Sequence, residues 1–298
     1  MELLGATTRL ALASIIALFL VSACSSEFFS GVASSGDKIV PNYPPLPNLP
    51  FHRKLNLEGV VRVGHRGAAG YCPENTLSAF RKAVQMEAQM IEFDVRLSQD
   101  HRYVVMHDDR LDRTTNGQGL LAEHPYVGDV DQLDAGSWFS EAFAGERVPT
   151  MPQVLEWVKE QPVAALVHVK QPGMSKEISR TIQELNLRGK IAILSEDPNE
   201  LDRFKASEPE VPTILSNTSG LSEEEILRRL REGKHQGALL SLKQLDRALA
   251  ERLHAEGFIV GVYGVESVGD IRTALERGAG MVLSKYPDRI QSLLSRSR

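Results

Sequence analysis

Short apolar runs alternate with amphipathic stretches from about residue 57 to the C-terminus. Runs of strand length, rich in β-branched residues, occupy 60–65, 90–95, 164–169, 190–195, 212–216, 237–242, 258–263 and 280–284. Helical spacing follows each run, at 76–85, 152–160, 175–185, 199–206, 222–233, 244–257, 267–278 and 288–294. Eight strand–helix units predict an α/β fold, a (β/α)8 TIM barrel, rather than an open doubly wound sheet.

The alternation is interrupted once, between the second predicted strand and its helix. Residues 103–108 read as an additional strand, and a stretch rich in Gly, Asp and aromatic residues continues to 147. We therefore expect a small insertion after the second strand, at about 108–147, on the side where barrel enzymes place their chemistry. The first strand is not followed by G-x-G-x-x-G, which removes the obvious dinucleotide-binding alternative.

The N-terminal region has a different composition from the predicted barrel. Its apolar run, 10–21, is too short to cross a bilayer and leads into a small-residue site followed by Cys24, which resembles a bacterial lipobox. We expect 1–23 to be a lipoprotein signal peptide, 24–56 to be a lipidated N-terminus with a Pro-rich linker, and 57–298 to be the barrel. An ordinary secretory peptide is the alternative.

A lipid anchor of this kind would place the protein in the bacterial cell envelope, on the periplasmic side. Ser25 after the modified cysteine resembles an outer-membrane sorting signal, so we expect the outer membrane. Cys72 is the other of the chain's two cysteines, and we expect it to be a packing residue rather than half of a structural disulfide. The formal net charge of −5 and the lack of a basic stripe argue against a nucleic-acid partner.

Polar residues gather at the C-terminal ends of the first two predicted strands. His65 and Arg66 end the first strand, and Glu92 and Asp94 lie two apart on the second, where they share a face. Two neighbouring carboxylates repel unless a cation compensates them, and a divalent metal is the simplest such cation. His107 ends the additional strand, and a pair of histidines beside such a site suits acid–base chemistry near neutral pH.

The third predicted strand adds His168 and Lys170, which also share a face. Together with the guanidinium of Arg66, these groups indicate metal-assisted phosphoryl transfer. Structural ion pairs between the acids and Arg96 or Lys170 remain an alternative. Four further histidines have no comparable neighbours and are expected to be solvated: His101, His124, His235 and His254.

The stretch GHRGAAGYCPENTLSAFRKAV, followed by IEFDVRLSQD, VVMHDDRLDRTTNGQG and GSWFSEAFAGERVPTMPQVLEW, resembles the glycerophosphodiester phosphodiesterase family. The similarity runs from about Val61 to Trp157 and continues weakly to the C-terminus. It implies a (β/α)8 barrel with a small insertion, and hydrolysis of glycerophosphodiesters to an alcohol and sn-glycerol 3-phosphate. By position, His65 and His107 match the family's acid/base pair, while Arg66 and Lys170 match its phosphate-binding and basic residues.

The same resemblance implies a divalent metal, Ca²⁺ or Mg²⁺, with Glu92 and Asp94 as two of its ligands. Glu74 and Asn75 match the family's first loop and are expected to shape the site. On the third strand the family pattern is Glu-x-Lys, whereas this chain has His168 in place of the glutamate. An imidazole ligand suits Mn²⁺ or Zn²⁺ better than a hard, oxygen-preferring cation.

Two further departures from the family lie near the C-terminus. Tyr263 replaces the usual Trp on the seventh strand, and Ser284-Lys285 replaces Thr-Asp after the eighth. Two alternatives therefore stay open beside the hydrolase. One is a lysophospholipase D- or sphingomyelinase D-like lipid phosphodiesterase, favoured by the predicted anchor. The other is a catalytically silent envelope binding module, favoured by His168 and Lys285.

Overall fold

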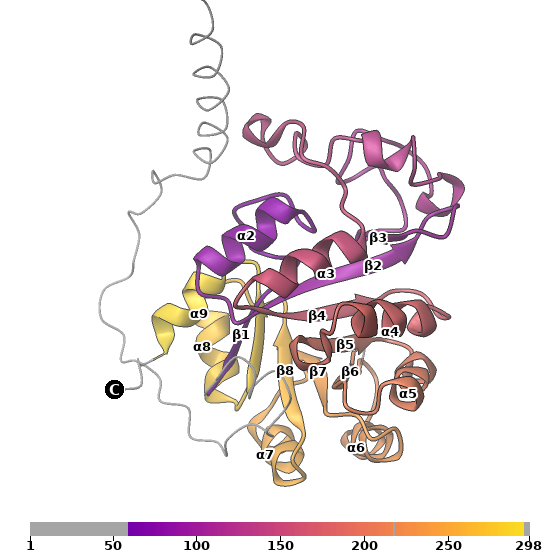
Figure 1. The fold of residues 1–298 in the computed structure, drawn as a ribbon. Coiled ribbons are helices and arrows are strands. Elements are labelled where there is room, and N and C mark those ends of the chain that lie inside the picture. Colours follow the sequence, from indigo (N-terminus) through magenta and orange to yellow (C-terminus); the bar gives the residue numbers. More distant parts are fainter. Residues whose placement is uncertain (1–58, 217, 295–298) are drawn as a thin grey trace, which may run out of the picture. The chain divides into compact units, whose positions relative to one another are not determined.

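The computed structural model describes residues 59–216 and 218–294. The predicted signal peptide, the predicted lipidation site Cys24 and the predicted linker lie outside these residues. Eight parallel strands form a closed barrel, because β1 pairs with both β2 and β9 (Figure 1). In chain order they are β1 (Val61–Gly64), β2 (Met90–Leu97), β4 (Ala164–Val169), β5 (Ile191–Ser195), β6 (Thr213–Leu215), β7 (Gly237–Ser241), β8 (Ile259–Tyr263) and β9 (Met281–Ser284).

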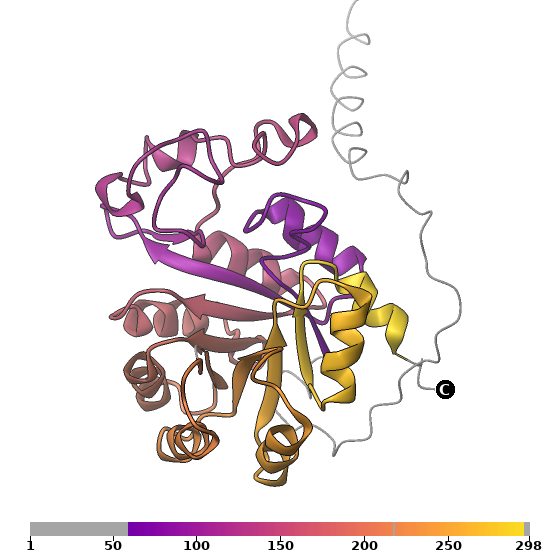
Figure 2. The same ribbon diagram turned by 180° about the vertical axis from the view of Figure 1, so that it is seen from behind.

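Each barrel strand is followed along the chain by an α-helix, and the helices lie outside the ring of strands (Figure 2). They are α2 (Leu77–Gln85), α3 (Met151–Glu160), α4 (Ser175–Glu184), α5 (Pro198–Ser207), α6 (Glu223–Glu232), α7 (Arg247–Ala255), α8 (Val268–Glu276) and α9 (Pro287–Leu293). Side-chain caps begin several of them, because the first amides of a helix lack intrahelical partners. At α3, Thr150 and Gln153 form a reciprocal capping box. The predicted TIM barrel is confirmed.

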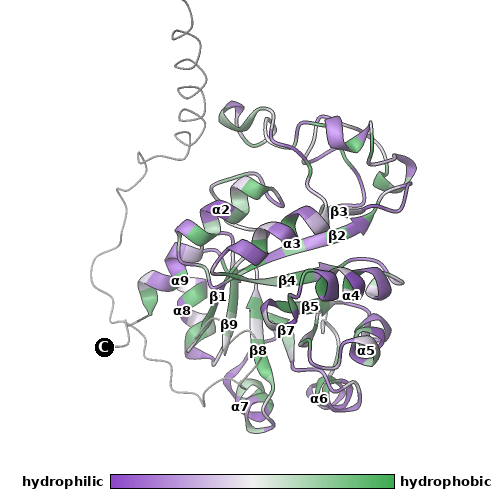
Figure 3. Ribbon diagram, in the orientation of Figure 1, coloured by the Kyte–Doolittle hydropathy of each residue, from purple (hydrophilic) through white to green (hydrophobic). Residues whose placement is uncertain are grey.

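Two apolar layers hold the barrel together, and the strands stand out as predominantly hydrophobic in Figure 3. One layer fills the space between strands and helices, and the other fills the barrel interior. Val61 and Val63 of β1 belong to the interior layer, as do Leu166 and Leu194 of β4 and β5. Polar side chains replace this apolar filling toward the C-terminal strand ends, where the interior becomes a site.

The insertion after β2 begins with β3 (Tyr103–Val105), which pairs antiparallel with β2. It continues through three short 3-10 helices, η2 (Leu121–Glu123), η3 (Val130–Gln132) and η4 (Glu141–Phe143), around a small apolar core of its own. A fourth, η5 (Arg188–Lys190), precedes β5. None of the helices described for this chain is long and apolar enough to cross a membrane.

His235 differs from the expectation that it is solvated. Its exposed fraction is 3%, and its Nδ1 lies 3.1 Å from the Thr213 hydroxyl oxygen at the start of β6. Burial lowers the pKa of His235, although the charge of Asp202 acts in the opposite direction. This histidine is therefore a buried structural residue at the N-terminal end of the barrel. Cys72 is also fully buried, as a packing residue would be.

Candidate active site

The C-terminal strand ends surround a cavity of about 280 Å³. Leu194, Leu239 and Leu283 contribute its apolar lining, and Tyr263 lies on its wall. The structure brings seven of the predicted site residues to this cavity: His65, Arg66, Glu92, Asp94, His107, His168 and Lys170. Parallel strands deliver them to one end because their carboxyl ends all meet there.

Glu92 and Asp94 form the buried centre of the site, each with an exposed fraction of 1%. His168 lies against both, with its Nδ1 3.1 Å from Asp94 Oδ1 and 3.6 Å from Glu92 Oε1. Burial alone would raise the pKa of Asp94, but the hydrogen bond and charge of His168, together with Arg66, hold it below its ordinary range. Burial alone would lower the pKa of His168, but the hydrogen bonds to the two carboxylates outweigh this effect and raise it.

Among the described residues, Glu92, Asp94 and His168 are a group whose ligand atoms could hold one metal ion, since these atoms lie within 4.8 Å of one another. Two carboxylate oxygens and an imidazole nitrogen are a common donor set for divalent transition metals. Buried carboxylates are costly unless a cation compensates them. The chemistry of the three donors therefore fits a divalent cation.

Arg66 fixes the first loop onto this centre. Its backbone is in the left-handed region, with φ of 53°, which is uncommon for a residue with a side chain. In that conformation its N–H donates to Glu92 Oε2 at 2.9 Å, and its Nη1 donates to Glu74 Oε1 at 2.7 Å. Its Nε lies 3.5 Å from Asp94 Oδ2. The observed partners of the acids thus include Arg66 and His168, and none of the ion pairs among the described residues joins either acid to Arg96 or Lys170.

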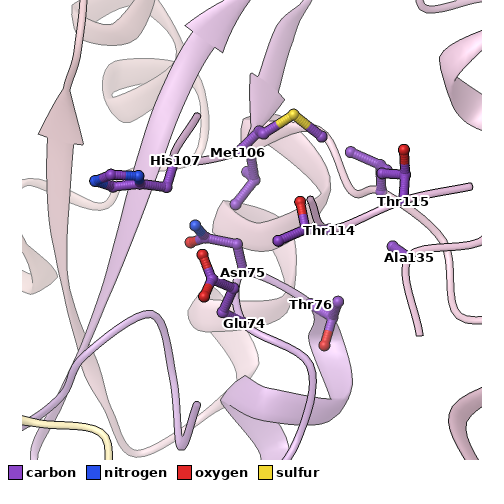
Figure 4. A pocket seen from close by; sticks show the side chains of 10 residues that line it. Glu74, Asn75, Thr76, Met106, His107, Thr114, Thr115 and Ala135 are labelled. Carbon is purple, nitrogen blue, oxygen red and sulfur yellow. The ribbon is translucent and has the colours of Figure 1, made fainter. Parts of the chain in front are cut away.

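Glu74 and Asn75 lie on the loop before α2, behind the main cavity. Asn75 is also left-handed, with φ of 60°, and its Nδ2 donates to Asp94 Oδ2 at 3.0 Å while its Oδ1 accepts from the Asp94 N–H at 3.3 Å. Figure 4 shows Glu74 and Asn75 side by side, with His107 across from them. Glu74 thus contacts Arg66, and Asn75 contacts Asp94, while their site-shaping role stays a prediction.

His107 is held by an acidic partner next to it in the chain. Its Nδ1 lies 2.7 Å from Asp108 Oδ1, so its Nε2 is left for chemistry in the cavity. Arg113 donates to Asp108 through Nε at 2.6 Å and also to Glu74 through Nη1 at 3.0 Å. The hydrogen bond from Arg113, against a smaller effect of burial, lowers the pKa of Asp108. One guanidinium therefore links the partner of His107 to the partner of Arg66.

His65 also has a carboxylate beside it, supplied by the loop after β8. Its Nδ1 lies 4.0 Å from Glu266 Oε1, an ion-pair distance, and its Nε2 lies 3.9 Å from Glu92 Oε2. Glu266 accepts from the Ser284 hydroxyl at 2.9 Å and from the Lys285 N–H at 2.8 Å. Burial would raise the pKa of Glu266, but these contacts and His65 keep it lowered. Ser284 and Lys285 thus orient a residue beside His65.

Lys170 reaches the cavity just beyond the end of β4 and contacts Glu196, which, like Glu266, was not singled out from the sequence. Its Nζ donates to Glu196 Oε1 at 3.4 Å. Glu196 follows β5, and its position in the chain gave no motif to find it by. Four charged residues at the site were not singled out individually: Asp108, Arg113, Glu196 and Glu266. Only Asp108 and Arg113 carried a signal, because both lie in the HD-x-x-LDR segment.

Comparison with known proteins supports one family. The glycerophosphoryl diester phosphodiesterase family model matches residues 65–289. A glycerophosphodiester phosphodiesterase of Bacillus subtilis (strain 168) is 30% identical over 259 residues, covering 78% of this chain and 86% of that protein.

Solved structures agree with the sequence match. An Oleispira antarctica phosphodiesterase in complex with the product sn-glycerol-3-phosphate is 28% identical, with a TM-score of 0.70, covering 78% of this chain and 95% of that one. A glycerophosphodiester phosphodiesterase from Agrobacterium tumefaciens str. C58 is 26% identical, with a TM-score of 0.69, covering 77% of this chain and 98% of that one. The chain therefore belongs to the glycerophosphoryl diester phosphodiesterase family of enzymes.

Proposed function

We propose that this chain hydrolyses glycerophosphodiesters to an alcohol and sn-glycerol 3-phosphate, with His65 and His107 as the acid/base pair. The observation that carries the proposal is that both imidazoles line one cavity with the cations Arg66 and Lys170. Each imidazole also has a carboxylate beside its Nδ1. The product held by the Oleispira antarctica phosphodiesterase, sn-glycerol-3-phosphate, supports the same substrate class.

In the proposed reaction, Arg66 and Lys170 attract the anionic phosphodiester and orient its oxygens. One histidine removes a proton from the attacking hydroxyl, which belongs to water or to a neighbouring group of the substrate. In the second case the displacement gives a cyclic phosphodiester, and water opens that ring in a further step to give sn-glycerol 3-phosphate. As the new P–O bond forms, the P–O bond to the leaving alcohol breaks. The other histidine then gives a proton to the departing alkoxide. The carboxylates beside the histidines stabilise whichever imidazole is cationic at that stage.

Glu92, Asp94 and His168 would hold the divalent metal of this site. When bound, the metal supplies positive charge that stabilises the developing negative charge on phosphoryl oxygens. The nitrogen donor of His168 favours Mn²⁺ or Zn²⁺ relative to the Ca²⁺ or Mg²⁺ that an all-carboxylate set prefers. Asn75 and Arg66 keep the two carboxylates in place for this role.

The test is an activity screen on the purified protein after metal removal. Glycerophosphocholine and glycerophosphoethanolamine are supplied with Ca²⁺, Mg²⁺, Mn²⁺ or Zn²⁺, and sn-glycerol 3-phosphate is measured with a coupled dehydrogenase. We expect turnover that depends on at least one of the four ions. No product with any of them would contradict the proposal and favour the silent module. Faster turnover of lysolipid micelles than of either soluble diester would favour the lipid phosphodiesterase.

We also propose that Cys24 carries a lipid that anchors the protein to the envelope, on the periplasmic side. The lipobox-like sequence before Cys24 supports this. Fractionation and lipid labelling of cells that express the full chain test it. The wild type should sediment with membranes, and Cys24→Ala should not be lipidated. Equal lipid labelling of both proteins would refute the anchor.

A further inference from the structure

The two ring nitrogens of His168 face different surroundings. Nδ1 points at the carboxylates of Glu92 and Asp94, at 3.6 and 3.1 Å. Nε2 is buried and makes no hydrogen bond to any part of the chain that the structure describes. The acidic atom facing it is Glu196 Oε1, at 3.9 Å. A buried ring nitrogen without a hydrogen bond is costly, so this arrangement calls for a polar partner at Nε2.

We propose that Glu196 is a positioning residue of the metal site, which accepts the Nε2–H of His168 and so presents Nδ1 as the ligand. The inference rests on the metal site proposed above. A neutral imidazole carries one N–H, and a hydrogen bond at one nitrogen determines that the other has the free lone pair. Metal-binding histidines commonly donate their second N–H to a carboxylate, which also makes the ligating nitrogen more basic.

The fold places Glu196 where this role requires it. His168 pairs with Leu194 across β4 and β5, and Glu196 lies two residues further along, on the same side as Leu194. The Glu196 side chain is 50% exposed, so it can swing by the ångström that separates 3.9 Å from a hydrogen bond. Lys170, which is only 10% exposed, restrains the same oxygen from the other side at 3.4 Å.

This geometry explains how an imidazole can act as a metal ligand beside two buried carboxylates. A carboxylate at the position of His168 would add a third negative charge directly to the centre. Here the third charge stands one strand away, on Glu196, and acts through the imidazole ring. Removing such an outer partner typically weakens metal binding about 10- to 100-fold.

The experiment is calorimetric titration of Mn²⁺ and Zn²⁺ into the metal-free full chain and its variants. Glu196→Ala should bind about 10- to 100-fold more weakly than the wild type. Glu266→Ala is the matched control, because it truncates a glutamate beside His65 and leaves His168 untouched. It should bind within about threefold of the wild type. Lys170→Met removes a nearby positive charge and should not weaken binding. Thermal melting of each metal-free variant checks that the fold is intact.

Three results would overturn the inference while leaving the proposed metal site intact. Binding by Glu196→Ala within twofold of the wild type would show that the carboxylate does not support His168. An equal loss in Glu266→Ala would show that the loss comes from the net charge of the cavity and not from a contact with His168. An equal loss in Lys170→Met would assign the effect to the Lys170–Glu196 pair. If the wild type bound neither ion, the proposed metal site would fail first, and this inference with it.

Discussion

The contact between His107 and Asp108 gives a quantitative prediction about catalysis. Their 2.7 Å contact is charge-assisted whenever His107 is protonated, and His107 is cationic at one stage of the proposed reaction. Hydrogen bonds to charged groups contribute about 1.5–3 kcal/mol. Asp108 is 27% exposed, so solvent screens part of this and about 1.5–2 kcal/mol remains. At about 1.4 kcal/mol per tenfold in rate, losing the charge corresponds to a drop in kcat of about 10- to 30-fold.

Asp108→Asn tests that value, because asparagine keeps one acceptor oxygen for His107 and removes the negative charge, while its amide nitrogen replaces the oxygen that accepts from Arg113 Nε. Steady-state turnover of glycerophosphocholine should show the drop in kcat with KM changed by less than about twofold. Asp112→Asn is the control. It removes an exposed carboxylate on the same loop, paired with Arg110, and should leave kcat unchanged. If Asp108→Asn retained more than half of the wild-type kcat, Asp108 would have no role in supporting His107.

Three further predictions concern the support of the site. Glu74→Gln should lower the free energy of unfolding at pH 7 by about 1–3 kcal/mol. Burial would raise the pKa of Glu74, but Arg113 and Arg66 hold it below its ordinary value near 4.5. The contribution of Glu74 to stability is therefore present above pH 4.5 and disappears as the pH falls through the pKa of the folded state. In acid, the wild type and the variant should then melt alike. Gly67→Ala should destabilise the fold by about 2–4 kcal/mol in urea unfolding, since φ is +79° and the new Cβ would lie 2.6 Å from the Ala79 carbonyl carbon. His168→Glu should raise calorimetric affinity for Ca²⁺ or Mg²⁺ relative to Zn²⁺, and unchanged selectivity would remove His168 from the ligand set.

The regular part of the fold could be predicted because each strand and helix carries its own periodic pattern. Each of the eight predicted barrel strands begins and ends within two residues of the observed strand, whereas the additional strand predicted at 103–108 ends three residues beyond β3. The insertion was predicted as an interruption, but its three 3-10 helices were not. They depend on packing around Leu111 and Leu121 in a separate small core, which local periodicity does not reveal.

The candidate site likewise contains residues that could be predicted from the sequence and residues that could not. His65, Glu92 and His107 could be found because they stand at strand ends within distinctive motifs. Glu196 and Glu266 could not, because each is an ordinary acidic residue until barrel closure brings it beside an imidazole. His235 was wrongly expected to be solvated for the same reason. Its short polar segment has no apolar pattern, whereas in the fold it lies beside Thr213 and is buried.

The most direct test of the proposed two-histidine mechanism is a kinetic cycle of His65→Ala, His107→Ala and the double variant, assayed on glycerophosphocholine with the activating metal. Each single variant should lose at least about 10²-fold in kcat, the lower end of what a positioned acid or base contributes. Because both histidines act on one reaction, the double variant should lose less than the product of the single losses. Thermal melting should show that each protein is folded. A folded single variant that kept a tenth or more of the wild-type kcat would contradict the mechanism.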